Sequence, residues 1–283
     1  MRRKSSLRTL RRVERCGRGT RAASLHASSR YALSIASALL TTPLLAQQPL
    51  ETETARLPLA GEVLIAGTFE FQTSNQGTER AAPIAIEVGV TDRFTLLAEP
   101  VLYTSIRPSE GFRASGIGDL EVTGQFLARR EQNGSPALAL GAEVKFPTAR
   151  NSLIGTGKTD FTPYLIASQR FGSYDVHANV GYSFVGKPAG LSVQNTWNFA
   201  LAAERHFGSS FDFVGEVLAS TAASKAGDGE NSPTAPEVAG AEFVGMLGGR
   251  YRVVPNLWFT FGVTYDNSGA VLFRPGITTE LRF

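Results

Sequence analysis

Residues 173–186 read SYDVHANVGYSFVG, a stretch in which polar and apolar side chains alternate. Every second position is polar or small, namely Asp175, His177, Asn179, Gly181 and Ser183. The positions between them are apolar, namely Tyr174, Val176, Ala178, Val180, Tyr182 and Phe184. Side chains two residues apart share one face of a β-strand, so the stretch predicts a strand with a polar and an apolar face.

The same alternation recurs along the chain from residue 61 to the C-terminus. It predicts twelve strands, at residues 61–72, 82–91, 93–104, 117–130, 136–146, 159–171, 173–186, 192–206, 210–222, 238–252, 256–266 and 271–283. Beyond residue 47 no run of 18 apolar residues occurs, which argues against helical membrane spans.

The connections between the predicted strands alternate in length. Short ones are expected at 91–93, 131–135, 172–173, 207–209 and 253–256, and longer ones at 73–81, 105–116, 147–158 and 221–237. The links at 187–191 and 267–270 are only moderately long and weaken the alternation slightly. Tight turns at one end and long loops at the other are typical of an outer-membrane barrel.

Strand length and aromatic placement favour a membrane barrel over a soluble sandwich. Many predicted strands have 11 to 15 residues, whereas about 10 tilted residues cross a bilayer and about 5 to 6 are usual in soluble sheets. Aromatic residues on the apolar face collect near both strand ends, as in the two aromatic girdles of membrane barrels. The sequence therefore predicts an all-β fold, an antiparallel transmembrane up-and-down β-barrel of about twelve strands over residues 61–283.

The N-terminus has the layout of a secretory signal peptide. Residues 1–46 hold ten Lys and Arg against one acid and end in an apolar region at 31–46, before a cleavage site expected near Ala46. A retained membrane anchor is the alternative. We expect residues 47–60 to form a periplasmic segment and the barrel to reside in the outer membrane. Cys16 would be removed with the signal.

Removal of the signal changes the charge of the protein. The 283-residue chain has a net charge of +3, but residues 47–283 hold 18 bases and 24 acids, a balance of −6. A nucleic-acid partner is therefore not expected.

The last predicted strand closes on Phe283, the C-terminal residue. An alternating strand that ends in Phe resembles the signal by which barrel-insertion machinery recognises its substrates. The alternative is an ordinary strand that ends in an aromatic residue.

Sequence motifs for catalysis are weak. Residues 155–159, GTGKT, lack the first glycine of a phosphate-binding loop and precede a predicted strand. No GxSxG or HExxH motif occurs, and His177 and His206 are the only histidines beyond the signal. We expect no catalytic residues, no metal and no cofactor.

The polar strand faces predict a charged barrel lumen. The expected lumen-lining residues are Glu70, Glu87, Glu99, Asp119, Glu121, Arg129, Glu143, Lys145, Arg170, Asp175, His177, Asp212, Glu216, Glu242, Arg250, Arg252, Asp266, Arg274, Glu280 and Arg282. Twelve strands would give a backbone radius of roughly 12 Å. These side chains form either a narrow polar conduit or a plug of ion pairs.

Four segments resemble one known family. They are GIGDL at 116–120, VKFPT at 144–148, GTGKTD at 155–160 and HANVGY at 177–182. They resemble the outer-membrane barrel family described as the MetA pathway of phenol degradation, often called simply a transporter. Members more often have Gly-Asp where Ala149 and Arg150 stand here. The resemblance implies a barrel that passes small, including aromatic, compounds, and implies no catalytic residues.

The leading hypothesis is a channel or uptake protein for small molecules, aromatic or hydrophobic ones included, in contact with the lipid bilayer. One alternative is an outer-membrane enzyme that acts on lipid and uses His177 or His206. The other is a structural or adhesive barrel that uses the loop at 221–237. The sequence makes no prediction of substrate identity or oligomeric state.

Overall fold

A computed structural model describes residues 48, 50–188, 193–223 and 241–283. The predicted signal peptide and its cleavage site lie outside the described residues, as does most of the loop at 221–237. Among the described residues no helix is long and apolar enough to span a membrane, a result that concerns helical spans alone.

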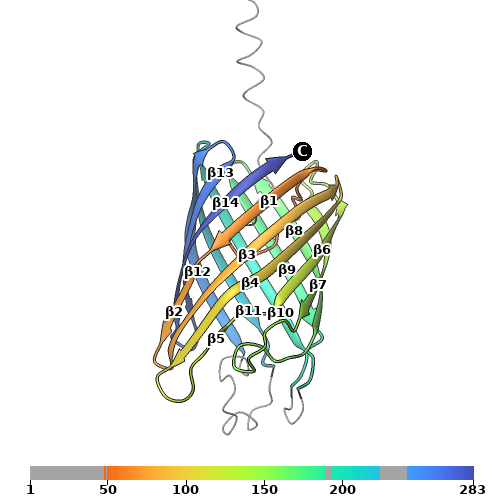
Figure 1. Cartoon of the computed structure of the whole chain (residues 1–283). Coiled ribbons are helices and arrows are strands. Elements are labelled where there is room, and N and C mark those ends of the chain that lie inside the picture. The colour runs from red at the N-terminus through yellow and green to blue at the C-terminus, as the bar shows by residue number, and fades with distance from the viewer. Residues whose placement is uncertain (1–47, 49, 189–192, 224–240) are drawn as a thin grey trace, which may run out of the picture. The chain divides into compact units, whose positions relative to one another are not determined.

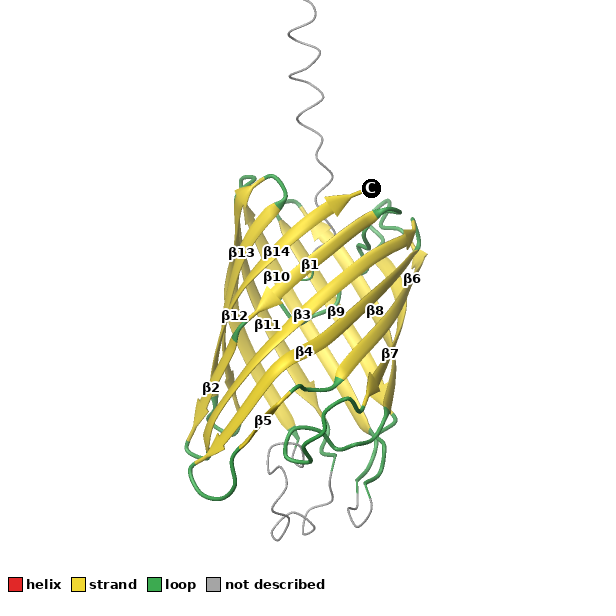
Figure 2. Cartoon of the chain, in the orientation of Figure 1, coloured by secondary structure: helices red, strands yellow, loops and turns green. Residues whose placement is uncertain are grey.

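All regular elements of the described chain are β-strands (Figures 1 and 2). They are β1 (Glu62–Thr68), β2 (Glu70–Ser74), β3 (Gly77–Thr91), β4 (Phe94–Pro108), β5 (Ala114–Gly116), β6 (Leu120–Arg129), β7 (Ala137–Phe146), β8 (Asp160–Phe171), β9 (Tyr174–Ser183), β10 (Thr196–Phe207), β11 (Phe211–Ser220), β12 (Glu242–Val254), β13 (Leu257–Asp266) and β14 (Val271–Arg282).

Twelve strand positions form the wall because two positions are each occupied by a pair of short strands. β1 and β2 both pair with β3 and β14, and β5 and β6 both pair with β4. Every pairing is antiparallel, and β14 pairs with β1 to close the sheet on itself. The predicted twelve-stranded antiparallel barrel is confirmed.

The two ends of the barrel differ (Figure 1). The C-terminus and the turns β3–β4, β8–β9, β10–β11 and β12–β13 lie at one end, which we call the tight-turn end. The opposite end carries the segments 109–113 and 147–159 and is called the long-loop end. In outer-membrane barrels these ends face the periplasm and the exterior respectively.

The wall is polar inside and apolar outside. Leu247 and Leu201 are 61% and 54% exposed on the outer face, while Glu204 and Arg250, which face inward, are 2% and 4% exposed. A soluble protein buries its leucines and exposes its charges. A continuous exposed apolar surface with charges enclosed behind it is the arrangement that suits a lipid surrounding.

Two predicted connections differ from the structure, and one of them, 105–116, is shortened to 109–113 because β4 and β5 include the other residues. Residues 73–81, expected to form a long loop, instead belong to β2 and β3, which are joined by a tight turn at Asn75 and Gln76. Thr73 pairs with Thr78, and Glu70 pairs with Ala81. The polar composition of this stretch suggests a loop, but its polar residues lie in a paired hairpin at the barrel rim.

Residues 48 and 50–58, here called the inner segment, lie inside the barrel. Glu51 and Thr52 contact β11, Ala55 contacts β8, and Leu57 packs against a buried apolar cluster that includes Leu127 and Ile166. The sequence analysis expected residues 47–60 to form a periplasmic segment. The structure places most of this segment in the lumen, because its polar groups find partners among the inward-facing charges.

Candidate functional site

The inner segment is anchored near the tight-turn end by Arg56. Its guanidinium lies 2.7 Å from a carboxylate oxygen of Asp175 and 2.8 Å from one of Glu131, which belongs to the β6–β7 turn. Burial raises the pKa of Glu131, but hydrogen bonds from Arg56 and from the Arg170 amide, with the charge of Arg56, lower it below its ordinary value. The anchor is thus a charge-assisted pair that depends on ionised Glu131.

A chain of charges continues from Asp175 across the lumen wall. Arg170 Nε donates to Asp175 at 2.8 Å, and the His206 ring lies 2.9 Å from Asp175 and 2.7 Å from Asp212. Arg250 then contacts both Asp212, at 3.1 Å, and Glu204. Both His206 nitrogens face carboxylate oxygens that only accept, an arrangement that suits a doubly protonated ring.

Among the described residues, side chains of this network form the arrangement most similar to a metal site. Ligand atoms of Glu204, His206 and Asp212 lie within 4.8 Å of one another. The Arg250 guanidinium lies on both carboxylates. Positive charge at this point is therefore supplied by arginine.

Ser168 and His177 connect the inner segment to this network. Ser168 Oγ accepts a hydrogen bond from the Ala55 amide at 2.8 Å and lies 2.8 Å from His177 Nδ1. His177 Nε2 stands 3.2 Å from Glu204, in a geometry that makes no hydrogen bond. The order Ser–His–Glu resembles a nucleophile with its base, but Ser168 is 1% exposed and covered by Ala55. A substrate has no access to its hydroxyl in this conformation.

The inner segment crosses the lumen at mid-height. The Glu216 carboxylate on β11 accepts hydrogen bonds from the amides of Glu51 and Thr52, at 3.1 Å for the closer oxygen in each case. On β9, which β10 alone separates from β11, the Asn179 amide group can make two hydrogen bonds with the Glu53 backbone, at 2.7 and 3.0 Å. Glu53 also contacts Gln125 on β6, whereas Gln48 and Leu50 contact β12 and β14, so the segment spans the lumen.

Arginines and a glycine complete the crossing. Arg274 donates to the Leu50 carbonyl at 3.0 Å, and Arg250 donates to the Gln48 carbonyl at 2.8 Å. A Cβ at Gly262 on β13 would lie 3.3 Å from Leu50 Cδ1, so the absence of a side chain there leaves room for Leu50.

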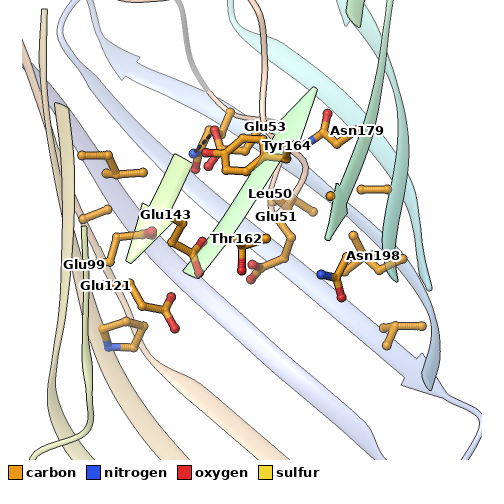
Figure 3. A pocket seen from close by; sticks show the side chains of 18 of the residues that line it. Leu50, Glu51, Glu53, Glu99, Glu121, Glu143, Thr162, Tyr164, Asn179 and Asn198 are labelled. Atoms are coloured by element: carbon orange, nitrogen blue, oxygen red, sulfur yellow. Dashed lines mark hydrogen bonds between the residues drawn. The ribbon is translucent and has the colours of Figure 1, made fainter. Parts of the chain in front are cut away.

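A cavity of about 560 Å³ lies in the lumen, walled on one side by the inner segment (Figure 3). Four carboxylates from neighbouring strands line it: Glu87 on β3, Glu99 on β4, Glu121 on β6 and Glu143 on β7. Glu51 and Glu53 of the inner segment add two more. The remaining lining residues that matter here are Leu97, Thr162, Tyr164, Asn198, Leu218 and Arg274.

Glu53 faces this cavity from the inner segment. Its carboxylate accepts hydrogen bonds from Gln48 at 2.8 Å and from Gln125 at 2.5 Å. Burial raises the pKa of Glu53, the two amide hydrogen bonds lower it, and the charge of Glu51 raises it, with a net rise. The inner segment thus brings a carboxyl group with an elevated pKa to a wall that is already acidic.

The residues expected to line the lumen, apart from Arg129, fall into several groups. Glu87, Glu99, Glu121, Glu143, Glu242 and Arg274 line the cavity. Arg170, Asp175, His177, Asp212 and Arg250 belong to the buried charge network, and Glu216 holds the inner segment. Glu280 and Arg282 pair at the tight-turn rim, where Arg252 stacks on Trp258. Glu70 binds Arg274, Lys145 binds Asp160, and Asp119 and Asp266 accept hydrogen bonds from loop amides.

Arg129 does not lie with the others. A bulge between Leu127 and Arg129 pairs Arg129 with Leu138, which faces outward. Its guanidinium donates to the Pro136 carbonyl at 3.0 Å at the exposed tight-turn end. The alternation of polar and apolar residues predicted a lumen position for Arg129. The bulge shifts the inward and outward faces of the strand by one residue, and the sequence gives no sign of the bulge.

Several site residues were missed by the sequence analysis. Glu204 lies in phase with His206 on β10, so alternation along that strand could have found it. Ser168 and Gln125 also lie on inward faces, but they are uncharged and do not stand out. The crossing by the inner segment has no sequence signal, since its hydrogen-bond and ion-pair partners come from six different strands.

Comparisons with known proteins agree with this fold. Residues 62–273 match the model of the family described as "Putative MetA-pathway of phenol degradation". The chain belongs to this family. The expected membership is therefore confirmed. A search of curated proteins finds no match.

Solved structures similar to the chain are outer-membrane barrels. An outer-membrane channel from Pseudomonas putida has a TM-score of 0.64 and 12% identity, over 83% of this chain and 100% of that one. The NanC porin has a TM-score of 0.53 and 13% identity, over 77% and 100%. The KdgM porin, solved with disordered oligogalacturonate, has a TM-score of 0.52 and 12% identity, over 76% and 98%. At these identities the likeness concerns the fold.

Proposed function

We propose that this protein is an outer-membrane channel for the uptake of small molecules. The observation that carries the proposal is the 560 Å³ cavity enclosed by the barrel wall and the inner segment. That volume falls in the range of about 300–1,000 Å³ found for small-molecule sites. The membership of the family and the fold shared with porins support a transport role.

The inner segment decides which solutes the channel admits. It crosses the lumen between β6 and β12 and divides the long-loop half, which holds the cavity, from the charge network of the tight-turn half. A solute that enters from the long-loop end therefore meets the cavity first and the segment next. Passage of anything larger than a small solute requires the segment to shift.

Further assignments extend the same proposal. We infer that residues 1–46 are removed as a signal peptide, that Phe283 is read by the barrel-insertion machinery, and that the cavity carboxylates form the solute path. The lipid-enzyme alternative is less well supported, because Ser168 and His177 are buried beneath Ala55. The adhesive alternative concerns the loop at 221–237, most of which lies outside the described residues.

The proposal is tested by solute flux into liposomes that contain the folded protein. Swelling rates should be measured for neutral solutes of increasing size, from glycerol to a disaccharide, with heat-denatured protein as the control. We expect entry of the smallest solutes and a steep decline with size. Equal, background-level swelling for every solute would contradict a channel function.

A further inference from the structure

The acidic wall of the cavity contains like charges placed against one another. Glu99 on β4 is the direct cross-strand partner of Glu121 on β6, and Glu143 on β7 is the partner of Thr123, two residues further along β6. Glu87 stands on the neighbouring strand β3 and lines the same cavity. Like charges directly opposite in a sheet destabilise it. The wall therefore favours a positive charge from outside the barrel.

The cations beside this wall are already paired. Lys145 binds Asp160 at 2.5 Å, and Arg274 contacts Glu51 and Glu70. In the described chain, Glu87, Glu99, Glu121 and Glu143 make no ion pair within 4 Å. The cavity consequently has more acidic than basic side chains in its wall.

A second observation also indicates a missing hydrogen-bond donor. The Gln125 side chain is 3% exposed, and its amide nitrogen lies against the Glu53 carboxylate that lines the cavity. Its carbonyl oxygen, Oε1, is buried without a hydrogen-bond partner. A buried acceptor left unpaired costs about 1–3 kcal/mol. Hydrogen-bond acceptors thus exceed donors around Gln125 and Glu53, next to the cavity.

The rest of the cavity wall is suited to the hydrocarbon part of an organic ligand. The Tyr164 ring lies beside Glu53 (Figure 3), and Leu97 and Leu218 line the same cavity. An aromatic face attracts a cation that approaches it, and aliphatic side chains pack against hydrocarbon. Among the described residues, the acids that cluster tightly enough for a metal ion are Glu204 and Asp212 with His206, outside the cavity. The spread carboxylates of the cavity are better matched to a larger cation.

We propose that the cavity binds organic ammonium ions. The ammonium group lies among Glu53, Glu99 and Glu121, while the hydrocarbon part contacts Tyr164 and Leu97. This inference rests on the proposed channel function and names its preferred substrate class. An ammonium group supplies three N–H donors and one positive charge, which are the two quantities that the cavity lacks.

The test is calorimetric titration of the folded, full-length protein in detergent with benzylammonium, benzyl alcohol and benzoate. These probes share a ring and differ in charge. We expect benzylammonium to bind at least tenfold more tightly than benzyl alcohol, and benzoate not to bind. Equal affinities for benzylammonium and benzyl alcohol in the wild-type protein would overturn the inference without any variant. Displacement of benzylammonium by equimolar Ca²⁺ would also overturn it, in favour of a metal site.

A variant pair locates the site. Glu99→Gln combined with Glu121→Gln should lower benzylammonium affinity at least tenfold and leave benzyl alcohol binding unchanged. Glu110→Gln, in the exposed segment 109–113, is the matched control and should bind as the wild type does. Undiminished binding to the folded double variant would contradict the assignment. Liposome swelling separates the two proposals, because a channel that admits neutral solutes but does not favour ammonium ions refutes only this one.

Discussion

Ser168 holds the inner segment through one oxygen atom. Its Oγ accepts from the Ala55 amide and contacts His177 Nδ1, both at 2.8 Å, and all three groups are buried. The hydroxyl has two lone pairs and one hydrogen, so it can accept from Ala55 whether it donates to His177 Nδ1 or accepts from it. The Ser168 hydroxyl therefore fixes the inner segment at Ala55 for either tautomer of His177.

Substitution Ser168→Ala leaves the Ala55 amide without an acceptor, at a cost of about 1–3 kcal/mol. We expect faster hydrogen exchange at residues 52–56, with little change in the strands. Exchange measured by mass spectrometry tests this. Ser183→Ala, which removes a lumen hydroxyl that contacts Thr162 and Asn198, is the control. Unchanged exchange at 52–56 would show that Ser168 is not an anchor.

Acid should loosen the Arg56 anchor. The pKa of Glu131 is lower in the folded protein than its ordinary value of 4.5, so its contribution is complete above about pH 4.5. As the pH falls through the lowered pKa, Glu131 takes up a proton and the contribution is lost. The protection factors of residues 52–57, which correct the exchange rates for the intrinsic effect of pH on amide exchange, should therefore fall at acid pH, and Glu131→Gln should remove part of that fall. An identical pH profile for Glu131→Gln would contradict the assignment.

At the scale of elements, the inner segment is the part of the chain that most restricts the lumen. Deletion of residues 50–58 removes a chain that crosses from β6 to β14. We expect single-channel conductance to increase several-fold. The double substitution Arg56→Ala with Ser168→Ala keeps the length and removes two anchors, and it should change conductance in the same direction. A deletion variant with wild-type conductance would show that the segment does not limit flow.

Strands were predictable from the sequence because the alternation of polar and apolar residues within each strand shows which residues share a face. In β9 the predicted alternation is uninterrupted: Val176, Ala178 and Val180 alternate with His177 and Asn179. Features that depend on distant partners were not predictable. The path of the inner segment arises from contacts between residues far apart in the chain. The bulge at Arg129 and the hairpin at residues 73–81 are local, but the alternation of polar and apolar residues does not reveal them.

The same distinction applies to the candidate site. Alternation indicated that Glu99, Glu121 and Glu143 face the lumen, and the structure places all three on one cavity. It could not show that Glu99 and Glu121 are cross-strand partners, because register is set by the whole barrel. Nor could it show that Glu53, from a segment expected outside the barrel, joins them.

At the scale of the whole molecule, the barrel encloses most of its acids behind an apolar outer surface. Residues 47–283 carry a net charge of −6, and the cavity is lined by seven glutamates and one arginine. A narrow passage with walls of one sign concentrates ions of the opposite sign. Cations should therefore pass in preference to anions. This preference arises from the acidic side chains of the lumen together and not from any single residue.

Reversal potential in a planar bilayer tests this central claim most directly. The folded protein should be inserted between KCl solutions that differ tenfold in concentration, and the current recorded against voltage. We predict a measurable conductance with a reversal potential of the sign that K⁺ selectivity requires. The magnitude of the reversal potential should be smaller in the Glu99→Gln, Glu121→Gln variant. A sealed barrel without conductance, or a reversal potential of the opposite sign, would contradict the account.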